Sequence, residues 1–467
     1  MKFKIPLAFT LGLVISVNLF NFILSDVESD SDRLTECMKT CNVILIVEDT
    51  LSAKHMGIYG SDNDTTPFIE EFFGEDSIIY TDMWSTASWT WASYASFMRS
   101  KYTSEVVLSE IVEPDPNSLT TILRRSGIGV FGDVPRKNNF IAESINLLVE
   151  PDKIIHNLYP PDDGYPGKFP QGSSLWLESE DRDRFFLLMH DVTVHDPYEP
   201  PIEYRHLYGS GEYLETISLW DLGNFGRDGH DPTAEEWTQV RQWEIQYDQE
   251  IRYFDDLFKS FIEAMPEEIL DNTIIIVTAD HGEAFGEHGR LLHSNIYSEV
   301  VHVPFLMHIP GFGTKVEITS PQSMIDLTPT VLSLMNVDYS GYNFSGQKLP
   351  FSQSEVDTSR YVKAEMGNHP VVNVSSTGAS LNKEDLTVSA MLDLRAVALR
   401  QGDVSVLVST MGEEIYLLDD DPDQQQVLKL GAPELSDLEK QIAEFLVEEG
   451  RKSVKKGEFE TDWFTSD

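Results

Sequence analysis

Cysteine is scarce in this chain, with two residues in 467, Cys37 and Cys41. Their Cys-x3-Cys spacing is not a usual zinc spacing, so the sequence offers no cysteine framework for a metal. An oxidised local pair would suit an exported protein, whereas two reduced thiols would have no catalytic importance. Both alternatives remain open from the sequence.

Basic residues are also few, since 34 lysines and arginines stand against 78 acidic residues, giving a formal net charge of −44. The acids are spread along the chain and not collected in one tail. A surface of this charge repels phosphate backbones, which excludes nucleic acid as a partner.

Long hydrophobic runs are absent after residue 24. Before it, Met1–Lys4 provides two lysines and Ile5–Leu24 is mostly apolar, which predicts a signal peptide or a retained signal-anchor over residues 1–25. In either case we expect the body of the protein to be exported, and to lie outside the cell, in a periplasm, or on the outer side of a membrane.

Three apolar, β-branched runs have the pattern of strands buried on both faces: Asn42–Val47, Phe185–Met189 and Asn272–Val277. Helical patterns alternate with them, at Thr65–Phe72, Asn117–Ser126, Gln239–Ala264 and Met324–Leu334. Val300–Pro310 reads as a further strand, in which Pro304 marks an edge or a break. The alternation predicts an α/β fold, with a central, mostly parallel sheet flanked by helices.

The C-terminal part has a different pattern. Leu394–Arg400, Val404–Val408 and Glu414–Leu418 predict antiparallel strands, and Glu434–Glu449 predicts a closing helix, so we expect a small α+β subdomain. Gly367–Lys383 is polar and predicts a linker or exposed loop. The predicted divisions are a linker (26–41), a main domain (42–345), the subdomain (346–450) and a tail (451–467).

Acidic residues and histidines follow each of the three buried runs, where functional groups collect in parallel sheets. They are Glu48, Asp49 and Thr50 after the first run, Asp191 and His195 after the second, and Asp280, His281, Glu283, Glu287, His288 and His293 after the third. Carboxylates beside imidazoles predict a metal site with mixed oxygen and nitrogen ligands. Solvated acids at a helix start would explain one such cluster, but explain three poorly.

The segment Thr86–Phe97 combines hydroxyl groups with aromatic residues at a predicted loop-to-helix junction. Unpaired N–H groups at a helix start attract anions, so an anionic substrate is expected there.

In order along the chain, these motifs resemble the sulfatase branch of the alkaline phosphatase superfamily. The matching segments, which span roughly Asn42 to Glu449, are Asn42–Leu51 with Met56-Gly-Ile-Tyr-Gly60, the region around Thr90, His195-Asp-Pro-Tyr198, Thr278-Ala-Asp-His-Gly-Glu283 and His293-x3-Tyr297-x-Glu299. The resemblance implies an alkaline-phosphatase-like fold, with 42–345 as the catalytic domain.

The resemblance also implies roles for individual residues. Asp49, Asp280 and His281 match the ligands of one divalent cation (Mn, Zn, Mg or Ca), and Thr90 matches the nucleophile. Sulfatases proper have at that position a cysteine or serine, converted to formylglycine and followed by Pro and Arg, whereas this chain has Thr90-Trp-Ala-Ser-Tyr94. The chain is therefore more similar to the threonine-nucleophile phosphatases, phosphodiesterases and phosphoglycerol transferases.

In several of these relatives a second cation is held by Asp-x3-His and a later histidine, which Asp191, His195 and His293 match. His195 and His293 are alternatively contacts for the substrate's anion. Glu48, Thr50 and His288 are expected to support the ligands from behind, and Glu283 and Glu287 to fix the turn.

We therefore expect a metal-dependent hydrolase or transferase that cleaves anionic, phosphate-type esters through a metal-activated threonine. A sulfatase acting without formylglycine is one alternative. A catalytically silent, anchored binding protein is another, suggested by Ala92, Tyr94 and Arg99-Ser100, where the sequence departs from its relatives.

Overall fold

The computed structural model describes residues 34–106, 115–134, 183–209, 232–293, 295–367, 394–409 and 412–454, with short pieces between them. The predicted signal or anchor segment and most of the predicted tail lie outside these residues. No helix in the described part of the chain is long and apolar enough to cross a membrane. Residues 34–40 are helical, and a disulfide joins Cys37 to Cys41, with 4.8 Å between the Cα atoms.

The main domain is built on an eight-stranded sheet in the order β12-β2-β11-β7-β1-β6-β4-β5. Neighbouring strands pair in parallel except on both sides of β11, which runs antiparallel to β2 and β7. This confirms the predicted α/β architecture with a mostly parallel sheet. The strands are β12 (Lys315–Ile318), β2 (Ser77–Tyr80), β11 (Phe305–His308), β7 (Thr273–Ala279), β1 (Asn42–Glu48), β6 (Phe185–Asp191), β4 (Gly129–Asp133) and β5 (Lys153–Ile154).

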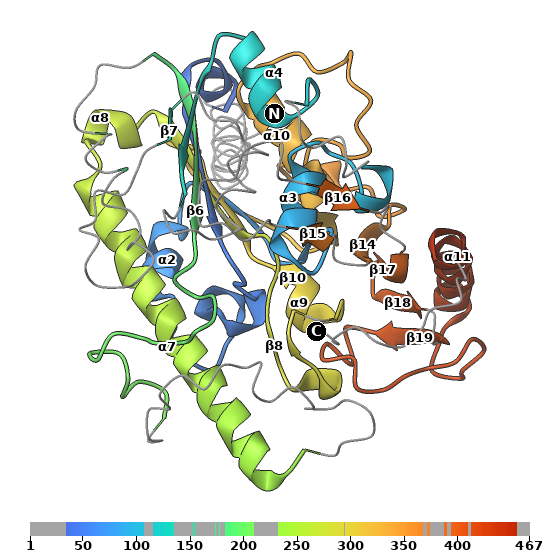
Figure 1. Cartoon of the computed structure of the whole chain (residues 1–467). Coiled ribbons are helices and arrows are strands. Elements are labelled where there is room, and N and C mark those ends of the chain that lie inside the picture. The colour runs from blue at the N-terminus through green and yellow to red at the C-terminus, as the bar shows by residue number, and fades with distance from the viewer. Residues whose placement is uncertain are drawn as a thin grey trace, which may run out of the picture.

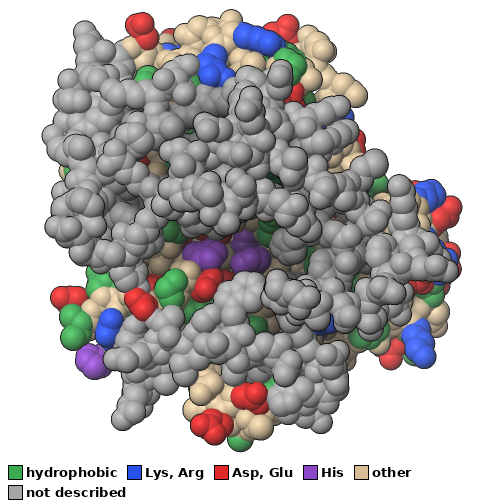
Figure 2. Space-filling view, in the orientation of Figure 1, with side chains coloured by type: hydrophobic (Ala, Val, Ile, Leu, Met, Phe, Trp, Pro, Cys, Tyr) green, Lys and Arg blue, Asp and Glu red, His purple; other side chains and the backbone are tan. Residues whose placement is uncertain are grey.

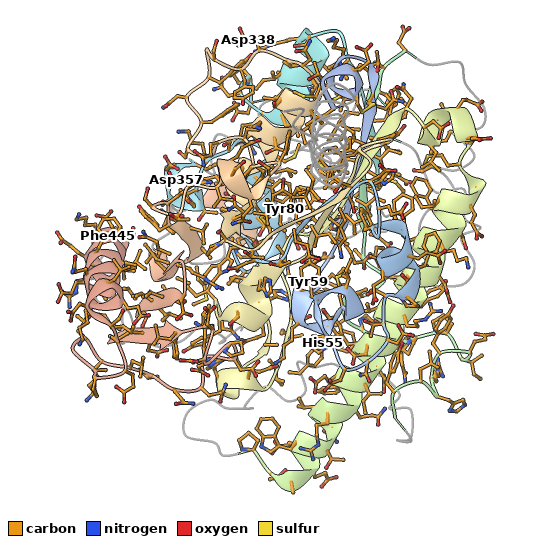
Figure 3. All side chains as sticks on the ribbon, turned by 180° about the vertical axis from the view of Figure 1, so that it is seen from behind. His55, Tyr59, Tyr80, Asp338, Asp357 and Phe445 are labelled. Atoms are coloured by element: carbon orange, nitrogen blue, oxygen red, sulfur yellow. A yellow bond between two sulfur atoms is a disulfide. The ribbon has the colours of Figure 1, made fainter. Side chains whose placement is uncertain are left out.

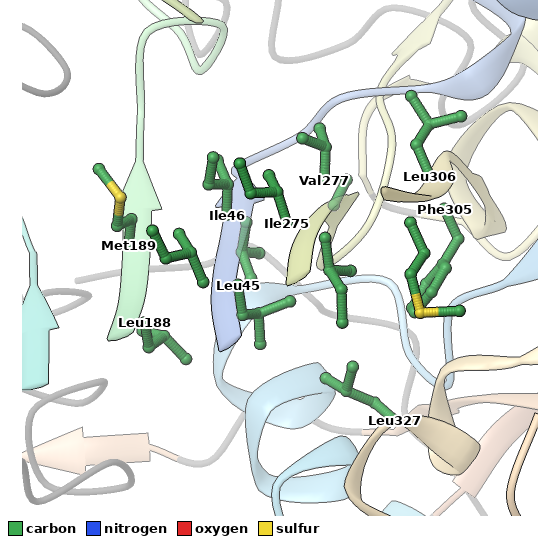
Figure 4. Packing of buried hydrophobic residues seen from close by; sticks show 14 of the residues in the cluster. Leu45, Ile46, Leu188, Met189, Ile275, Val277, Phe305, Leu306 and Leu327 are labelled. Atoms are coloured by element: carbon green, nitrogen blue, oxygen red, sulfur yellow. The ribbon is translucent and has the colours of Figure 1, made fainter. Parts of the chain in front are cut away.

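The three predicted buried strands, β7, β1 and β6, lie side by side at the centre of this sheet, and every residue in them is buried. Their side chains pack on both faces, with Leu45 and Ile46 of β1 between Leu188 of β6 and Ile275 of β7 (Figure 4). Burying each such aliphatic side chain contributes roughly 1.5–3 kcal/mol. The apolar character of these runs therefore explains their central place.

Helices cover both faces of the sheet (Figure 1). The long helix α7 (Ala234–Ala264) lies on one face, and α3 (Thr90–Phe97), α4 (Leu119–Arg125) and α10 (Leu327–Leu334) lie on the other. A capping box between Thr233 and Glu236 starts α7 five residues before the predicted Gln239. The buried side of α7 includes Ile251 and Phe254, as predicted, whereas Ile245 is only partly buried.

A carboxylate of α7 binds the first turn of helix α2 (Pro67–Phe72). Asp255 of α7 accepts hydrogen bonds from the backbone N–H groups of Phe68 (3.0 Å) and Ile69 (2.8 Å), which lie in the first turn of α2. Burial raises the pKa of Asp255 to about 6, although the two N–H donors and Arg252 act in the opposite direction. The short helix α8 (Glu267–Leu270) then leads into β7.

The single strand predicted over Val300–Pro310 is two strands after a helical turn, namely α9 (Ser298–Val301), β10 (His302–Val303) and β11. Pro304 separates β10 from β11, so the predicted break is confirmed. The alternative of an edge strand is wrong, because β11 lies between β2 and β7 inside the sheet. Strand β10 instead pairs with β3 (Met83–Trp84), which also pairs with β13 (Gln322–Ser323).

The C-terminal subdomain has an antiparallel sheet, β14 (Val362–Gly367), β17 (Leu394–Gln401), β18 (Val404–Ser409) and β19 (Gly412–Leu417), covered by α11 (Asp437–Ser453). This confirms the three predicted strands and the closing helix, whose outward side chain Phe445 is labelled in Figure 3. The predicted linker Gly367–Lys383 is not entirely without structure, because β15 (Val371–Asn373) lies within it and pairs with β16 (Thr387–Ser389).

Ion pairs join this subdomain to the main domain. Arg400 of β17 binds Asp82 through two nitrogens, at 3.0 and 2.9 Å, and Arg360 binds Asp326 in the same bidentate way. The remaining short elements are β8 (Ala284–Phe285), β9 (Leu291–Leu292), η1 (Ala53–His55), η2 (Gly57–Tyr59), η3 (Thr103–Glu105), η6 (Glu287–Gly289), η7 (Met324–Asp326) and η8 (Gln353–Glu355).

Candidate active site

The predicted site residues come together because β7, β1 and β6 are adjacent and parallel, so their carboxyl ends meet at one edge of the sheet. Asp49 follows β1, and Asp280 and His281 follow β7. Their side-chain ligand atoms lie within 4.8 Å of one another, and all three residues are completely buried. The alternative of solvated acids at a helix start is therefore wrong for these residues.

This group has the chemistry of a cation site. Asp49 Oδ1 and Asp280 Oδ2 are buried acceptors without a hydrogen-bond partner, and each lies 3.6 Å from His281 Nε2. Ligand atoms placed tetrahedrally about 2.1 Å from a zinc ion are about 3.4 Å apart. The residues present thus fit one divalent cation, which would give both orphaned oxygens a partner.

The electrostatics of the group point the same way. Burial, followed by the charge of Asp49, raises the pKa of Asp280 well above its usual range. The pKa of Asp49 is lowered by His195, His190 and His281, which together outweigh the effect of its burial. Burial lowers the pKa of His281 to about 3, so the imidazole is neutral and keeps a lone pair for a metal.

Thr90 lies beside this group, as predicted. It is the first residue of α3, and its Oγ1 is 3.5 Å from Asp49 Oδ2 and 3.4 Å from His281 Nε2. The residue is 7% exposed. A hydroxyl group at a helix start, next to two residues that could hold a cation, is well placed to be activated as a nucleophile.

His195 and His293 form the outer side of the site. The ring of His293 is 4.5 Å from that of His281 and 6.2 Å from that of His195, measured between centroids. Asp49, Asp196 and Glu283 raise the pKa of His195 to about 9 against the opposing effect of burial. The side chains of His195 and His293 are 21% and 24% exposed. Figure 2 shows a hollow with histidine side chains in it.

Glu283, expected only to fix the turn, contacts one of these histidines directly. One oxygen accepts from His293 Nδ1 (3.2 Å) and the other accepts from the Tyr198 hydroxyl (3.0 Å). The hydrogen bond from His293 to Glu283 places the imidazole hydrogen of His293 on Nδ1 and leaves Nε2 for another partner. Glu283 is therefore a positioning residue for His293.

Asp191, predicted as a ligand of a second cation, has other partners in the structure. Its Oδ2 accepts from the Thr193 hydroxyl (2.7 Å), and its charge raises the pKa values of Glu48 and Glu250, after the larger effect of burial on both. Among the described residues, Asp191, His195 and His293 form no group whose ligand atoms converge. Within the part of the chain that the structure describes, one such group is found, that of Asp49, Asp280 and His281.

The predicted supporting residues hold the loops around the ligands. The N–H of Thr50, a residue with φ of +63°, donates to Asp280 Oδ1 (3.4 Å), and Glu48 Oε1 accepts from the N–H of Val194 (2.8 Å). His288 pairs with Glu299 Oε1 (3.1 Å) and with a carbonyl of the C-terminal subdomain, that of Gln424 (3.0 Å).

Glycines allow the loop after β7, residues 280–293 and here called the ligand loop, to pass close to other segments. A Cβ at Gly282 would lie 2.4 Å from the carbonyl oxygen of Glu299 and 3.1 Å from Ser52 Cβ, so only glycine fits. Gly286 and Gly289 instead have left-handed φ values of +101° and +65°. These are two different reasons for glycine in one loop.

Sequence reasoning missed His190. It is the last residue but one of β6 and precedes Asp191. Successive strand residues point to opposite faces, so His190 lies on the side of Asp49 and α3. Its Nε2 is 3.4 Å from Asp49 Oδ2. The alternation of side chains along this strand was the signal that could have found it.

Residues 41–337 match the model of the family described as Sulfatase. Arylsulfatase K of Mus musculus is 36% identical over 80 residues, and choline-sulfatase of Rhizobium meliloti (strain 1021) is 26% identical over 174 residues. These segments are 16% and 34% of this chain, and they span only 14% and 33% of those two relatives.

Solved structures share the fold. The phosphonate monoester hydrolase of Agrobacterium radiobacter superposes with a TM-score of 0.62 at 16% identity, over 87% of this chain and 95% of that one. The C-terminal periplasmic domain of EcEptC from Escherichia coli, in complex with Zn, superposes with a TM-score of 0.52 at 14% identity, over 76% and 95%. Identities this low establish the fold alone.

Proposed function

The chain belongs to the sulfatase family of the alkaline phosphatase superfamily, and from this premise we propose that it is an ester hydrolase, that Thr90 is its nucleophile and that phosphate-type esters are its substrates. One observation carries the proposal. A threonine hydroxyl occupies the position 3.4–3.5 Å from two residues of the cation group.

The identity of this residue favours phosphate over sulfate. Formylglycine is an aldehyde made by oxidising a primary carbon, whereas oxidation of the threonine side chain would give a ketone. The two cysteines of the chain are joined in a disulfide before β1, so neither is at the site to be converted to formylglycine. The hydroxyl of Thr90 must therefore attack as it is.

Asp49, Asp280 and His281 would hold the divalent cation, which would lower the pKa of a neighbouring hydroxyl and offset the charge of the ester. Zinc is a reasonable first choice, since one structural neighbour was solved with it. His195 and His293 lie on the open side, where their imidazoles would contact the oxygens of the anionic group.

The reaction takes two steps. Thr90 Oγ1 loses its proton and bonds to phosphorus while the bond to the leaving oxygen breaks, and the leaving oxygen takes up a proton. Water then attacks the same phosphorus, breaks its bond to Thr90 and returns a proton to Oγ1. An alcohol in place of water would make the enzyme a transferase.

Sulfate esters are the second candidate, favoured by the relatives named as sulfatases. A silent binding protein is the third. We include export in the proposal, because a disulfide between Cys37 and Cys41 suits an oxidising compartment. Fractionation of the producing cells, with the protein found only in the cytoplasm, would contradict export.

The full chain should be assayed with Mn, Zn, Mg or Ca against aryl phosphate, bis-aryl phosphate and aryl sulfate. Thr90→Ala should lower turnover at least about 10³-fold, and an acid quench of the wild type should trap phosphate on Thr90, detectable by mass spectrometry. Thr120→Ala, which changes another buried threonine, in α4, is the control.

Full activity in Thr90→Ala would refute the nucleophile, and preferential turnover of aryl sulfate would refute the substrate class. A chain that binds no divalent cation and turns over none of the three esters would be the silent protein.

A further inference from the structure

Two buried side chains lie between α3 and the cation group and have no role in the reaction described above. They are Tyr94 of α3 and His190 of β6, and the second of them faces Asp49. The Tyr94 hydroxyl is 3.0 Å from His190 Nδ1, and His190 Nε2 is 3.4 Å from Asp49 Oδ2. The side chains of His190 and Asp49 are completely inaccessible to solvent, and Tyr94 is 0% exposed.

The hydrogen of Tyr94 determines the state of His190. Burial raises the pKa of Tyr94 well above its usual range, so the phenol keeps its hydrogen. Within the described part of the chain, His190 Nδ1 is the hydrogen-bond partner of that hydroxyl. A phenol that donates to Nδ1 leaves the imidazole hydrogen on Nε2, the nitrogen that faces Asp49.

We propose that Tyr94 and His190 are positioning residues, which hold Asp49 in its metal-binding orientation through an Nε2–H directed at Oδ2. Groups that hydrogen-bond to a metal ligand fix its direction, and their loss typically lowers metal affinity or activity about 10- to 100-fold. This inference deepens the proposed function and rests on its cation group.

The arrangement also ties the ligand to the nucleophile. Thr90 and Tyr94 are four residues apart on α3 and so lie on the same side of the helix. Thr90 Oγ1 and His190 Nε2 approach the same oxygen of Asp49, at 3.5 and 3.4 Å. A shift of α3 would therefore change the position of Thr90 and the support of Asp49 together.

A direct role as metal ligand is the competing interpretation of His190, because its Nε2 makes no hydrogen bond of good geometry. The ligand atoms of Asp49, Asp280 and His281 converge within 4.8 Å, but His190 does not join that group. The geometry thus favours the positioning role.

The test compares four variants of the full chain by calorimetric titration with Zn in the absence of substrate. His190→Leu should lose about 10- to 100-fold in affinity. His190→Gln retains an amide N–H near the position of Nε2 and should recover part of this loss. Tyr94→Phe should lose less than His190→Leu. Tyr80→Phe, at a fully buried tyrosine that donates to the carbonyl of Pro350 (2.9 Å; Figure 3), should lose none.

The second measurement is the tautomer of His190 in the cation-free wild type, from long-range ¹⁵N–¹H correlations of histidine-labelled protein. We expect the hydrogen on Nε2, with this preference lost in Tyr94→Phe. A hydrogen on Nδ1, direct Zn coordination by Nε2, or equal losses in His190→Gln and His190→Leu would overturn the proposal. The tautomer of Tyr94→Phe decides the question even if the position-190 variants do not fold.

These readouts need no substrate. The proposed function can therefore fail, through an active Thr90→Ala, while the positioning role stands, and the reverse also holds.

Discussion

Gly282 offers a test of how strictly the ligand loop is placed. It follows His281, and its N–H donates to the carbonyl of Val300 (2.7 Å). The Cβ of Gly282→Ala would lie 2.4 Å from the carbonyl oxygen of Glu299, where real Cβ contacts essentially never fall below 3.0 Å. Ser52 closes the other side, with its Cβ at 3.1 Å.

The required displacement is therefore about 0.6 Å, the difference between 3.0 and 2.4 Å. Because Asp280 and His281 directly precede the glycine, the shift passes to both ligands. A misplacement of 1 Å can cost about 100-fold in rate, so we expect Gly282→Ala to lose roughly 10- to 100-fold in kcat/KM and in metal affinity. Overpacking should also lower the free energy of unfolding by about 1–3 kcal/mol.

The assay is metal titration and steady-state turnover of the best aryl ester, with circular dichroism to verify folding. Gly341→Ala is the matched control, since a Cβ at Gly341 meets nothing within 4 Å. A folded Gly282→Ala with the affinity and turnover of the wild type would refute the claim that close approach, and not flexibility, requires this glycine.

Three further predictions concern stability. Burial raises the pKa of Asp255 to about 6 in the folded protein, whereas the pKa of an aspartate in the unfolded chain is about 3.9. The stability that the protonated Asp255 contributes is therefore fully present below about pH 3.9 and is lost as the pH rises through about 6. In urea unfolding, the free energy of unfolding of the wild type should fall by about 3 kcal/mol over this range, and that of Asp255→Asn should not. Arg400→Met would leave the buried Asp82, which is 6% exposed, without its cationic partner, and should lower the free energy of unfolding by about 2–3 kcal/mol. Arg451→Met, on the surface, should change the free energy of unfolding little. Equal effects of the two variants in thermal unfolding would contradict this. Chelation should destabilise the wild type by about 2.7 kcal/mol if the cation was present at 100 times its dissociation constant, and an equal loss in Asp280→Ala would place the cation elsewhere.

The central sheet, and the edge of it at which the cation group lies, could be predicted from the sequence because both depend on local patterns. Fully apolar runs identify strands buried on two faces, and the residues directly after them must lie at the same edge once the strands pair in parallel. This pattern placed acids and histidines at one edge, the resemblance to sulfatases singled out Asp49, Asp280 and His281 among them, and the structure brings the ligand atoms of these three within 4.8 Å of one another.

Other features depend on side-chain direction and on strand order, which the sequence pattern does not give. Asp191 and His190 are neighbours, yet alternation along β6 sends them to opposite faces, so the predicted ligand contacts Thr193 and the overlooked histidine lies beside Asp49. The interior position of β11 was missed because Pro304 marks a break without saying where the next strand pairs.

The central place of β7, β1 and β6 also has a consequence for folding. Asp49 and the Asp280-His281 pair are separated by more than 200 residues along the chain and become neighbours only when β7 pairs with β1. Such long-range pairing forms late, because the entropy of loop closure is lost before the contacts form. A cation that binds all three residues would therefore stabilise only chains in which this pairing is complete, and its uptake during refolding would report the moment at which the two halves of the sheet join.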